Sequence, residues 1–221
     1  MTNEKLIMMK QPNSFVAQSY KMLRTNINYM NKEGKYKVYM ITSSVPGEGK
    51  STTISNLAVS FAQVGQKVLL IDTDLRCGVI HGILNVNQSP GLTDYLSTSI
   101  DLAEIIQPAQ GIENLDVIAT GLRPPYPSEL LTSEKLKNMI YVTRNYYDVV
   151  LIDAPPILYV SDATEIAQSA DGLIMVVAAN KTQKNEILNA KKAMDKVGVK
   201  IIGVTITKSN NKQKGSYYVE D

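Results

Sequence analysis

The chain has 221 residues, of which 44% are hydrophobic and 20% charged, as expected for a soluble globular protein of one domain. A net charge of +2 gives no general attraction to nucleic acid or to acidic lipid, so we expect neither as a direct partner. The single cysteine, Cys77, excludes an internal disulfide, and no apolar run is long enough for a transmembrane helix. The first residues also lack the apolar core of a signal peptide.

The first 31 residues divide into two parts. Residues 1–13 show no regular pattern and are predicted to be a loose leader. Residues 14–31 are predicted to form an amphipathic helix, because apolar residues recur near helical spacing. The polar face of this helix carries Gln18, Lys21 and Arg24, which neighbour one another because they are three residues apart. The simplest interpretation of this face from spacing alone is a solvated surface.

A phosphate-binding loop is predicted after the first strand. The apolar run at 37–42 leads into a glycine-rich turn, a Lys, a hydroxyl pair and a helical pattern, which is the context of a P-loop. Its backbone N–H groups would cradle phosphate oxygens at a helix N-terminus. The usual pattern, G-x-x-x-x-G-K-[ST], has Gly where this chain has Ser44. The predicted nucleotide-binding residues are Pro46, Gly47, Glu48, Gly49, Lys50, Ser51 and Thr52.

Strands and helices alternate through the rest of the chain. Short apolar runs with few polar residues are typical of strands buried on both faces of a parallel sheet. The sequence therefore predicts an α/β fold of the P-loop NTPase type, with a mostly parallel sheet and helices on both faces, over residues 14–208. Residues 209–221 are polar and are predicted to be a mobile tail containing Tyr217 and Tyr218. The expected strands are 67–72, 115–118, 147–153, 172–178 and 199–206, and the expected helices are 50–64, 92–97, 101–107, 133–144, 161–169 and 182–197.

Carboxylates follow two of these strands. Asp72 and Asp74 end one strand and Asp153 ends another, at the edge where open α/β sheets bind ligands. Mg²⁺ prefers oxygen ligands, and in P-loop proteins it is held by the loop hydroxyl and a strand-end carboxylate. A further carboxylate could accept a proton from an attacking hydroxyl or orient a water. The residues therefore predict a site for ATP and Mg²⁺.

These motifs resemble a known family. The segments SSVPGEGKST, VLLIDTDLR, GLRPPYPSELL and LIDAPP are similar, in this order, to those of bacterial tyrosine kinases of the capsular-polysaccharide type (CpsD/CapB-like). These kinases belong to the MinD/ParA-like P-loop ATPases. The resemblance covers about Ser14 to Lys208. It implies an ATP-dependent protein-tyrosine kinase that phosphorylates its own C-terminal tyrosines in trans and regulates synthesis and export of capsular or extracellular polysaccharide.

The resemblance also implies residue roles. Lys50 and Ser51 would bind the phosphates and Mg²⁺, and Asp72 would accept the proton of the tyrosine. Asp74 would lie close to the metal, and Asp153 would be the Walker B carboxylate, so that the metal site is Ser51, Asp74 and Asp153. The acceptors would be Tyr217 and Tyr218.

The implied partners are other proteins. The family works with a membrane adaptor that supplies an activating cytoplasmic C-terminal segment and with a protein-tyrosine phosphatase. The kinase would therefore be cytoplasmic and recruited to the inner face of the membrane. It would also assemble into a ring through the helix at 14–31.

Several departures from the family pattern matter. The ring helix normally carries E-x-x-R-x-x-R, where this chain has Gln18, Lys21 and Arg24, so we predict a weaker ring because a Gln–Lys pair cannot be bidentate. A MinD/ParA-like ATPase switch is the first alternative, and Val45 in place of that group's signature Lys counts against it. A nucleotide-binding scaffold without kinase activity is the second, and the intact Lys50 and acidic residues count against it.

Overall fold

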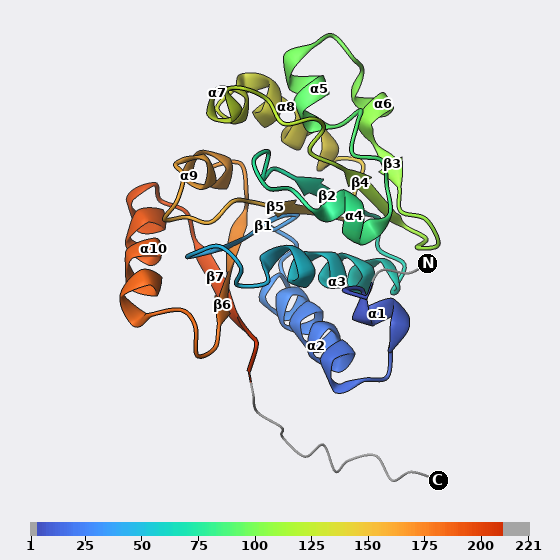
Figure 1. The fold of residues 1–221 in the computed structure, drawn as a ribbon. Helices are drawn as coiled ribbons and strands as arrows, with labels where there is room; N and C mark the ends of the chain where they lie inside the picture. Colours follow the sequence, from blue (N-terminus) through green and yellow to red (C-terminus); the bar gives the residue numbers. More distant parts are fainter. Residues whose placement is uncertain (1–3, 210–221) are drawn as a thin grey trace.

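The structure, a computed structural model, describes residues 4–209 and is built on a seven-stranded sheet of order β3-β4-β2-β5-β1-β6-β7 (Figure 1). All neighbouring strands pair in parallel except β3 and β4, which are antiparallel. The fold class predicted from the sequence is confirmed. The strands are β1 (Val38–Ser43), β2 (Val68–Asp72), β3 (Gln107–Pro108), β4 (Leu115–Ile118), β5 (Val149–Asp153), β6 (Gly172–Ala178) and β7 (Ile201–Thr207).

Helices cover both faces of the sheet. Every residue of β1, β2, β5 and β6 is buried, because side chains that alternate between the faces meet a helical layer on each side. The helices are α1 (Ile7–Lys10), α2 (Phe15–Met30), α3 (Lys50–Ala62), α4 (Ile80–Leu84), α5 (Leu92–Ser97), α6 (Leu102–Ile105), α7 (Pro127–Leu131), α8 (Glu134–Thr143), α9 (Asp162–Ala167) and α10 (Lys184–Lys196).

Two hydrophobic cores result, one on each face. Tyr39 and Ile41 of β1 pack with apolar residues of α1 to α4, whereas Val38 and Met40 pack with residues of α5 and of α7 to α10. Figure 1 shows α1, α2 and α3 lying together on one side of the sheet. This double cover fixes β1, and with it the loop that follows β1.

The N-terminal segment differs from the loose leader predicted for residues 1–13. Residues 7–10 form α1, and Leu6 and Met8 are buried against α3. The Asn56 side chain of α3 holds this segment, because it accepts the N–H of Met8 at 3.0 Å and donates to the carbonyl of Lys5 at 2.7 Å. Two buried apolar residues and the two hydrogen bonds of Asn56 therefore hold this single-turn helix in place.

Most of the remaining elements lie close to their predicted positions. Helix α4 was not predicted, since Gly82 and two isoleucines in five residues give a weak helical pattern. Helix α6 ends at Ile105, earlier than predicted, because Gln107 and Pro108 pair with β4. No helix within residues 4–209 has the length and apolar character needed to cross a membrane. The predicted acceptors Tyr217 and Tyr218 lie outside the described residues.

Candidate active site

The glycine-rich loop joins β1 to α3 at the carboxyl edge of the sheet. Gly47 and Gly49 have φ angles of 74° and 96°, in the left-handed region that favours glycine. A Cβ atom at Gly47 would also lie 2.9 Å from the Lys181 Nζ. Ser44, at the first glycine position of the motif, does not have a positive φ angle, so a serine is accommodated there without strain. The loop thus keeps glycine at the two positions where its conformation requires it.

Glu48 fixes the shape of the loop from inside. Its carboxylate is buried and accepts the N–H of Val45 at 2.8 Å, the N–H of Ala178 at 3.1 Å and the hydroxyl of Thr182. The side chain therefore points away from any bound phosphate and connects the loop to the end of β6. Only the backbone of this predicted nucleotide-binding residue is available for a ligand.

Two lysines and a threonine hold the carbonyl side of the same loop. Lys208 donates to the carbonyl of Gly47 at 2.6 Å, and Lys181 donates to that of Pro46 at 3.2 Å. The hydroxyl of Thr207 donates to the carbonyl of Glu48. Since the carbonyl groups are occupied in this way, the N–H groups are left to face the opposite side. These contacts come from distant parts of the chain and could not be predicted from local pattern.

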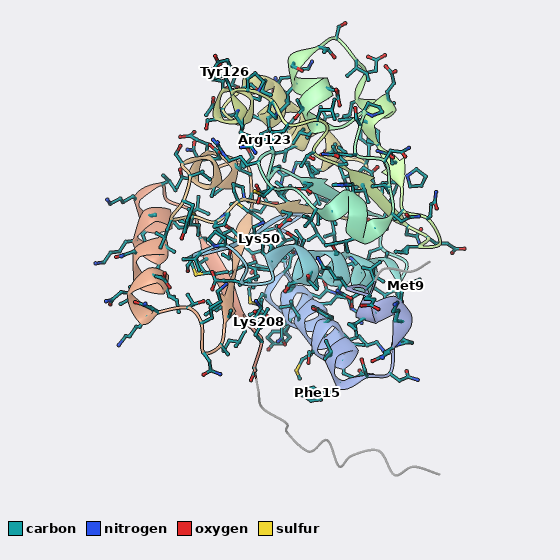
Figure 2. The ribbon with its side chains drawn as sticks, in the orientation of Figure 1. Met9, Phe15, Lys50, Arg123, Tyr126 and Lys208 are labelled. Atoms are coloured by element: carbon teal, nitrogen blue, oxygen red, sulfur yellow. The ribbon has the colours of Figure 1, made fainter. Side chains whose placement is uncertain are left out.

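The predicted acidic residues are brought together around Lys50. The Lys50 Nζ lies 3.0 Å from Asp74 Oδ2 and 3.9 Å from Asp153 Oδ1. Asp72 and Asp153 are direct neighbours in the parallel pairing of β2 and β5. Burial lowers the pKa of Lys50, but attraction by Asp153, Asp74 and Asp72 outweighs this and raises its pKa above the ordinary value. Lys50 is therefore a permanent cation at the start of α3 (labelled in Figure 2).

Asp153 is fully buried, and neither of its carboxylate oxygens has a hydrogen-bond partner. Burial raises its pKa, and attraction by Lys50 opposes the rise. The hydroxyl of Ser51 lies nearby without forming a hydrogen bond of normal geometry to it. A buried carboxylate without hydrogen bonds is costly and is commonly explained by an ion or a water.

The donor set fits Mg²⁺. Ser51 and Asp74 supply a hydroxyl and a carboxylate at the pocket, and the unpaired oxygens of Asp153 lie beside Ser51. Within residues 4–209, no three His, Cys, Asp or Glu side chains converge to hold a metal by themselves. A metal here would therefore depend on the hydroxyl, on phosphate oxygens and on water, as Mg²⁺ commonly does.

Asp72 is more enclosed than its predicted role as a base suggests. It is fully buried, and its oxygens accept the N–H of Asp74 at 3.2 Å and of Ile80 at 3.1 Å. Burial, followed by repulsion from Asp153, raises the pKa of Asp72 well above its ordinary value. A raised pKa makes a carboxylate a stronger base, but Asp72 is not among the residues that line the pocket.

A pocket of about 480 Å³ opens over the glycine-rich loop and Lys50. Asp74 lines it, whereas Asp72 and Asp153 do not. The pocket thus has a floor formed by the glycine-rich loop and Lys50, and a second, mainly apolar wall. Its lining residues are Pro46, Gly47, Gly49, Lys50, Ser51, Thr52, Asp74, Arg76, Cys77, Val79, Pro155, Pro156, Tyr159 and Val160.

The three predicted oligomer residues are placed on α2 and make contacts within the chain. Arg24 donates from Nη1 to the carbonyl of Ser60 at 2.6 Å, and Lys21 donates to the carbonyl of Pro12 at 3.0 Å. Gln18 is half-buried. Arg24 thus joins α2 to the last turn of α3, a contact that spacing along the helix did not reveal.

Known proteins match most of this chain in sequence. Residues 36–201 match the family described as AAA domain. Tyrosine-protein kinase YwqD of Bacillus subtilis is 39% identical over 219 residues, which cover 98% of this chain and 92% of that protein. Tyrosine-protein kinase CpsD of Streptococcus agalactiae is 41% identical over 192 residues, which cover 86% of this chain and 82% of that protein.

Solved structures show the same relationship. The kinase domain of Escherichia coli tyrosine kinase ETK has a TM-score of 0.92 and 30% identity, covering 100% of this chain and 86% of that one. MinD of Pyrococcus horikoshii, complexed with Mg-ADP, has a TM-score of 0.68 and 26% identity, covering 79% of this chain and 72% of that one. With its intact glycine-rich loop, lysine and strand-end carboxylates, the chain belongs to the family of bacterial tyrosine-protein kinases.

Proposed function

We propose that this kinase uses ATP with Mg²⁺ to phosphorylate Tyr217 and Tyr218 at its own C-terminus, in trans. The observation that carries the proposal is the arrangement of Lys50 between Asp74 and Asp153, whose carboxylate has no hydrogen-bond partner, at the glycine-rich loop. Mg-ADP bound to MinD, a protein of the same fold, supports the choice of nucleotide and metal.

Binding of ATP would rearrange the charges in this site. The loop N–H groups and the helix N-terminus favour phosphate, and Lys50 would leave Asp74 to contact the β- and γ-phosphates. Mg²⁺, held by Ser51, Asp74 and Asp153, would neutralise charge that develops on the phosphate oxygens. Asp74 then exchanges one cation for another, so its carboxylate stays paired throughout.

The transfer step needs one proton acceptor. The phenol oxygen of the acceptor attacks the γ-phosphorus while the bond from that phosphorus to the β–γ bridging oxygen breaks, and ADP leaves with the electron pair. Asp72 takes the phenol proton, for which its raised pKa suits it. Because Asp72 does not line the pocket, acceptor binding must expose one of its oxygens; each oxygen accepts a single N–H, from Asp74 or from Ile80, and keeps a second lone pair for the proton.

Mass spectrometry tests this function. The purified chain is incubated with ATP and Mg²⁺, alone and with the cytoplasmic segment of its membrane adaptor, and phosphotyrosine is mapped. We expect phosphate on Tyr217 or Tyr218 and none in Lys50→Met. Binding of ATP without phosphotyrosine under both conditions would overturn the proposal and favour a nucleotide-binding scaffold. Phosphate release stimulated by DNA or lipid would favour a MinD-like switch.

A comparison of two variants tests the assignment of the base. Asp72→Asn should lower kcat at every pH while ATP binding remains within about twofold. Asp74→Asn should weaken the binding of Mg²⁺-nucleotide, because Asp74 is a proposed ligand. The assignment is wrong if Asp72→Asn keeps more activity than Asp74→Asn at saturating Mg²⁺-ATP.

We further propose the cellular setting that the family implies. A membrane adaptor would recruit the kinase to the inner face of the membrane, a phosphatase would reverse the reaction, and the cycle would regulate capsular or extracellular polysaccharide. The ring would be weak, because Gln18 and Lys21 replace Glu and Arg of the family helix. Sedimentation tests the ring: Gln18→Glu combined with Lys21→Arg should shift the chain toward a larger oligomer, and an unchanged distribution would contradict the role of this helix.

A further inference from the structure

The outer wall of the pocket suits a phenol ring. Beyond the floor of the pocket the lining is largely apolar, with one arginine at its edge. Tyr159 on this wall is about two-thirds exposed, so the wall is open to an incoming chain. The glycine-rich loop and Lys50 form the rest of the pocket, so this wall is where an acceptor tyrosine would lie. The wall consists of Arg76, Val79, Pro155, Pro156, Tyr159 and Val160.

Arg76 is held in a fixed orientation by two partners. Its Nε donates to Asp162 Oδ2 at 3.2 Å, and its Nη2 donates to the hydroxyl of Ser128 at 3.0 Å. Ser128 in turn donates to Asp162 Oδ1 at 2.6 Å, so both oxygens of this buried carboxylate are used. The three residues come from the loop after β2, from α7 and from α9. Such a closed network sets the plane of the guanidinium.

The other edge of this guanidinium remains available. An arginine has five N–H groups, and the three not used here bond to nothing that the structure describes in residues 4–209. About a third of the side chain is exposed at the pocket. Asp162 balances the formal charge of Arg76, so a ligand would be selected by hydrogen-bond geometry at short range. The planar fork of an arginine matches a carboxylate.

We propose that Arg76 binds a carboxylate two residues after the acceptor tyrosine, with Asp162 and Ser128 as positioning residues. This inference rests on the proposed phosphorylation of the C-terminal segment, whose sequence is Tyr217-Tyr218-Val219-Glu220-Asp221. In an extended acceptor, side chains two residues apart point to the same side, about 7 Å from one another. Tyr218 then places Glu220 toward Arg76, whereas Tyr217 places Val219 there. Tyr218 is therefore the preferred acceptor.

Peptide kinetics tests this preference. The acceptors are amidated peptides of residues 210–221 that carry Tyr217→Phe, with or without Glu220→Gln. The enzyme is the full chain with Tyr217→Phe and Tyr218→Phe, assayed with the adaptor segment present. We expect Glu220→Gln to raise the KM for peptide about tenfold, with kcat and the KM for ATP within about twofold, as for loss of one charge-assisted bidentate contact.

Variants of the enzyme assign the effect to Arg76. Arg76→Gln should raise the KM for the acidic peptide and abolish the difference between the two peptides. Arg76→Lys should retain only part of the KM difference between the two peptides. Ser128→Ala should raise the KM for the acidic peptide less than Arg76→Gln does. Arg123→Gln is the matched control, because Arg123 is an exposed arginine of the loop before α7 that does not line the pocket (labelled in Figure 2).

Equal KM values for the two peptides with the unaltered pocket would overturn the inference. An Arg76→Gln variant that changes the KM for ATP and not the KM for peptide would also overturn it, and would place Arg76 on the nucleotide. These results differ from failure of the proposed function itself, in which no peptide and no C-terminal tyrosine would receive phosphate.

Discussion

Two buried aspartates of this kinase should respond in opposite ways to the same substitution. Asp153 has no hydrogen-bond partner, whereas Asp162 is bonded to Arg76 and Ser128. Asp153→Asn removes a buried charge that has an ion-pair distance of 3.9 Å to Lys50 but no hydrogen bond. Asp162→Asn breaks a satisfied network and leaves Arg76 without its ion pair. We expect the first variant to be more stable than the unaltered protein and the second to be less stable.

The magnitudes follow from the contacts. An unsatisfied buried polar group costs about 1–3 kcal/mol, and the neutral amide keeps part of that cost, so Asp153→Asn should gain about 1–2 kcal/mol. For a chain of this size, that gain corresponds to a rise in Tm of about 2–8 °C. Lys50 keeps Asp74 at 3.0 Å, so the substitution does not leave its charge unpaired. Asp162→Asn should lose about 1–3 kcal/mol, a value reduced by the partial exposure of Arg76.

The gain should depend on pH in a defined direction. Because burial raises the pKa of Asp153, the folded protein binds this proton more tightly than the unfolded chain. The free energy of unfolding of the unaltered protein therefore falls as the pH rises from about 4 toward the raised pKa. Asp153→Asn has no titrating group at this position, so its free energy of unfolding does not show this decrease. The advantage of the variant should be largest at neutral pH and should shrink on acidification.

Thermal unfolding with and without Mg²⁺-ADP measures both effects. The unaltered protein should gain about 2.7 kcal/mol at a ligand concentration one hundred times its Kd, and Asp153→Asn should gain much less at the same concentration because a proposed metal ligand is lost. The reasoning is refuted if Asp153→Asn is less stable than the unaltered protein at neutral pH without nucleotide. It is also refuted if Mg²⁺-ADP stabilises both equally.

Three further substitutions test the side-chain hydrogen bonds that hold the glycine-rich loop, α2 and α1 in place. Glu48→Ala should raise the Kd for ATP about tenfold while the protein stays folded, because the loop loses its hydrogen bond to Ala178. Calorimetric ATP binding measures this Kd, and an unchanged value would contradict the prediction. Arg24→Ala should cost about 1–2 kcal/mol in urea unfolding through loss of its bond to Ser60, and a neutral result would count against that contact. Asn56→Ala should accelerate amide exchange in residues 5–10, whereas equal protection would show that packing alone holds α1.

The sequence was sufficient to predict which residues meet at the floor of the pocket. The P-loop motif is local, and carboxylates that end buried parallel strands must meet at one edge of the sheet. The observed pairing of Asp72 with Asp153, and the contact of Lys50 with Asp74, agree with that rule. The fold class followed from the alternation of buried strands and helices for the same reason.

The hydrogen bonds and ion pairs that hold the site residues in place were not predictable, because they join residues far apart in the chain. Arg76 and Asp162 are 86 residues apart, and the contact between Lys208 and Gly47 spans 161 residues. Glu48 lies within the predicted binding motif, but no local pattern shows that its side chain points inward. Helix α1 was missed since its stability comes from packing on α3 and not from its own four residues.

The most direct test of the proposed reaction separates the catalytic site from the acceptor. One chain carries Lys50→Met with its C-terminal tyrosines intact, and the other has an intact site with Tyr217→Phe and Tyr218→Phe. The two are mixed with ATP, Mg²⁺ and the adaptor segment, and each is analysed by mass spectrometry. We predict phosphotyrosine at Tyr217 or Tyr218 of the Lys50→Met chain only. If that chain receives no phosphate while the unaltered protein phosphorylates itself, transfer in trans is contradicted.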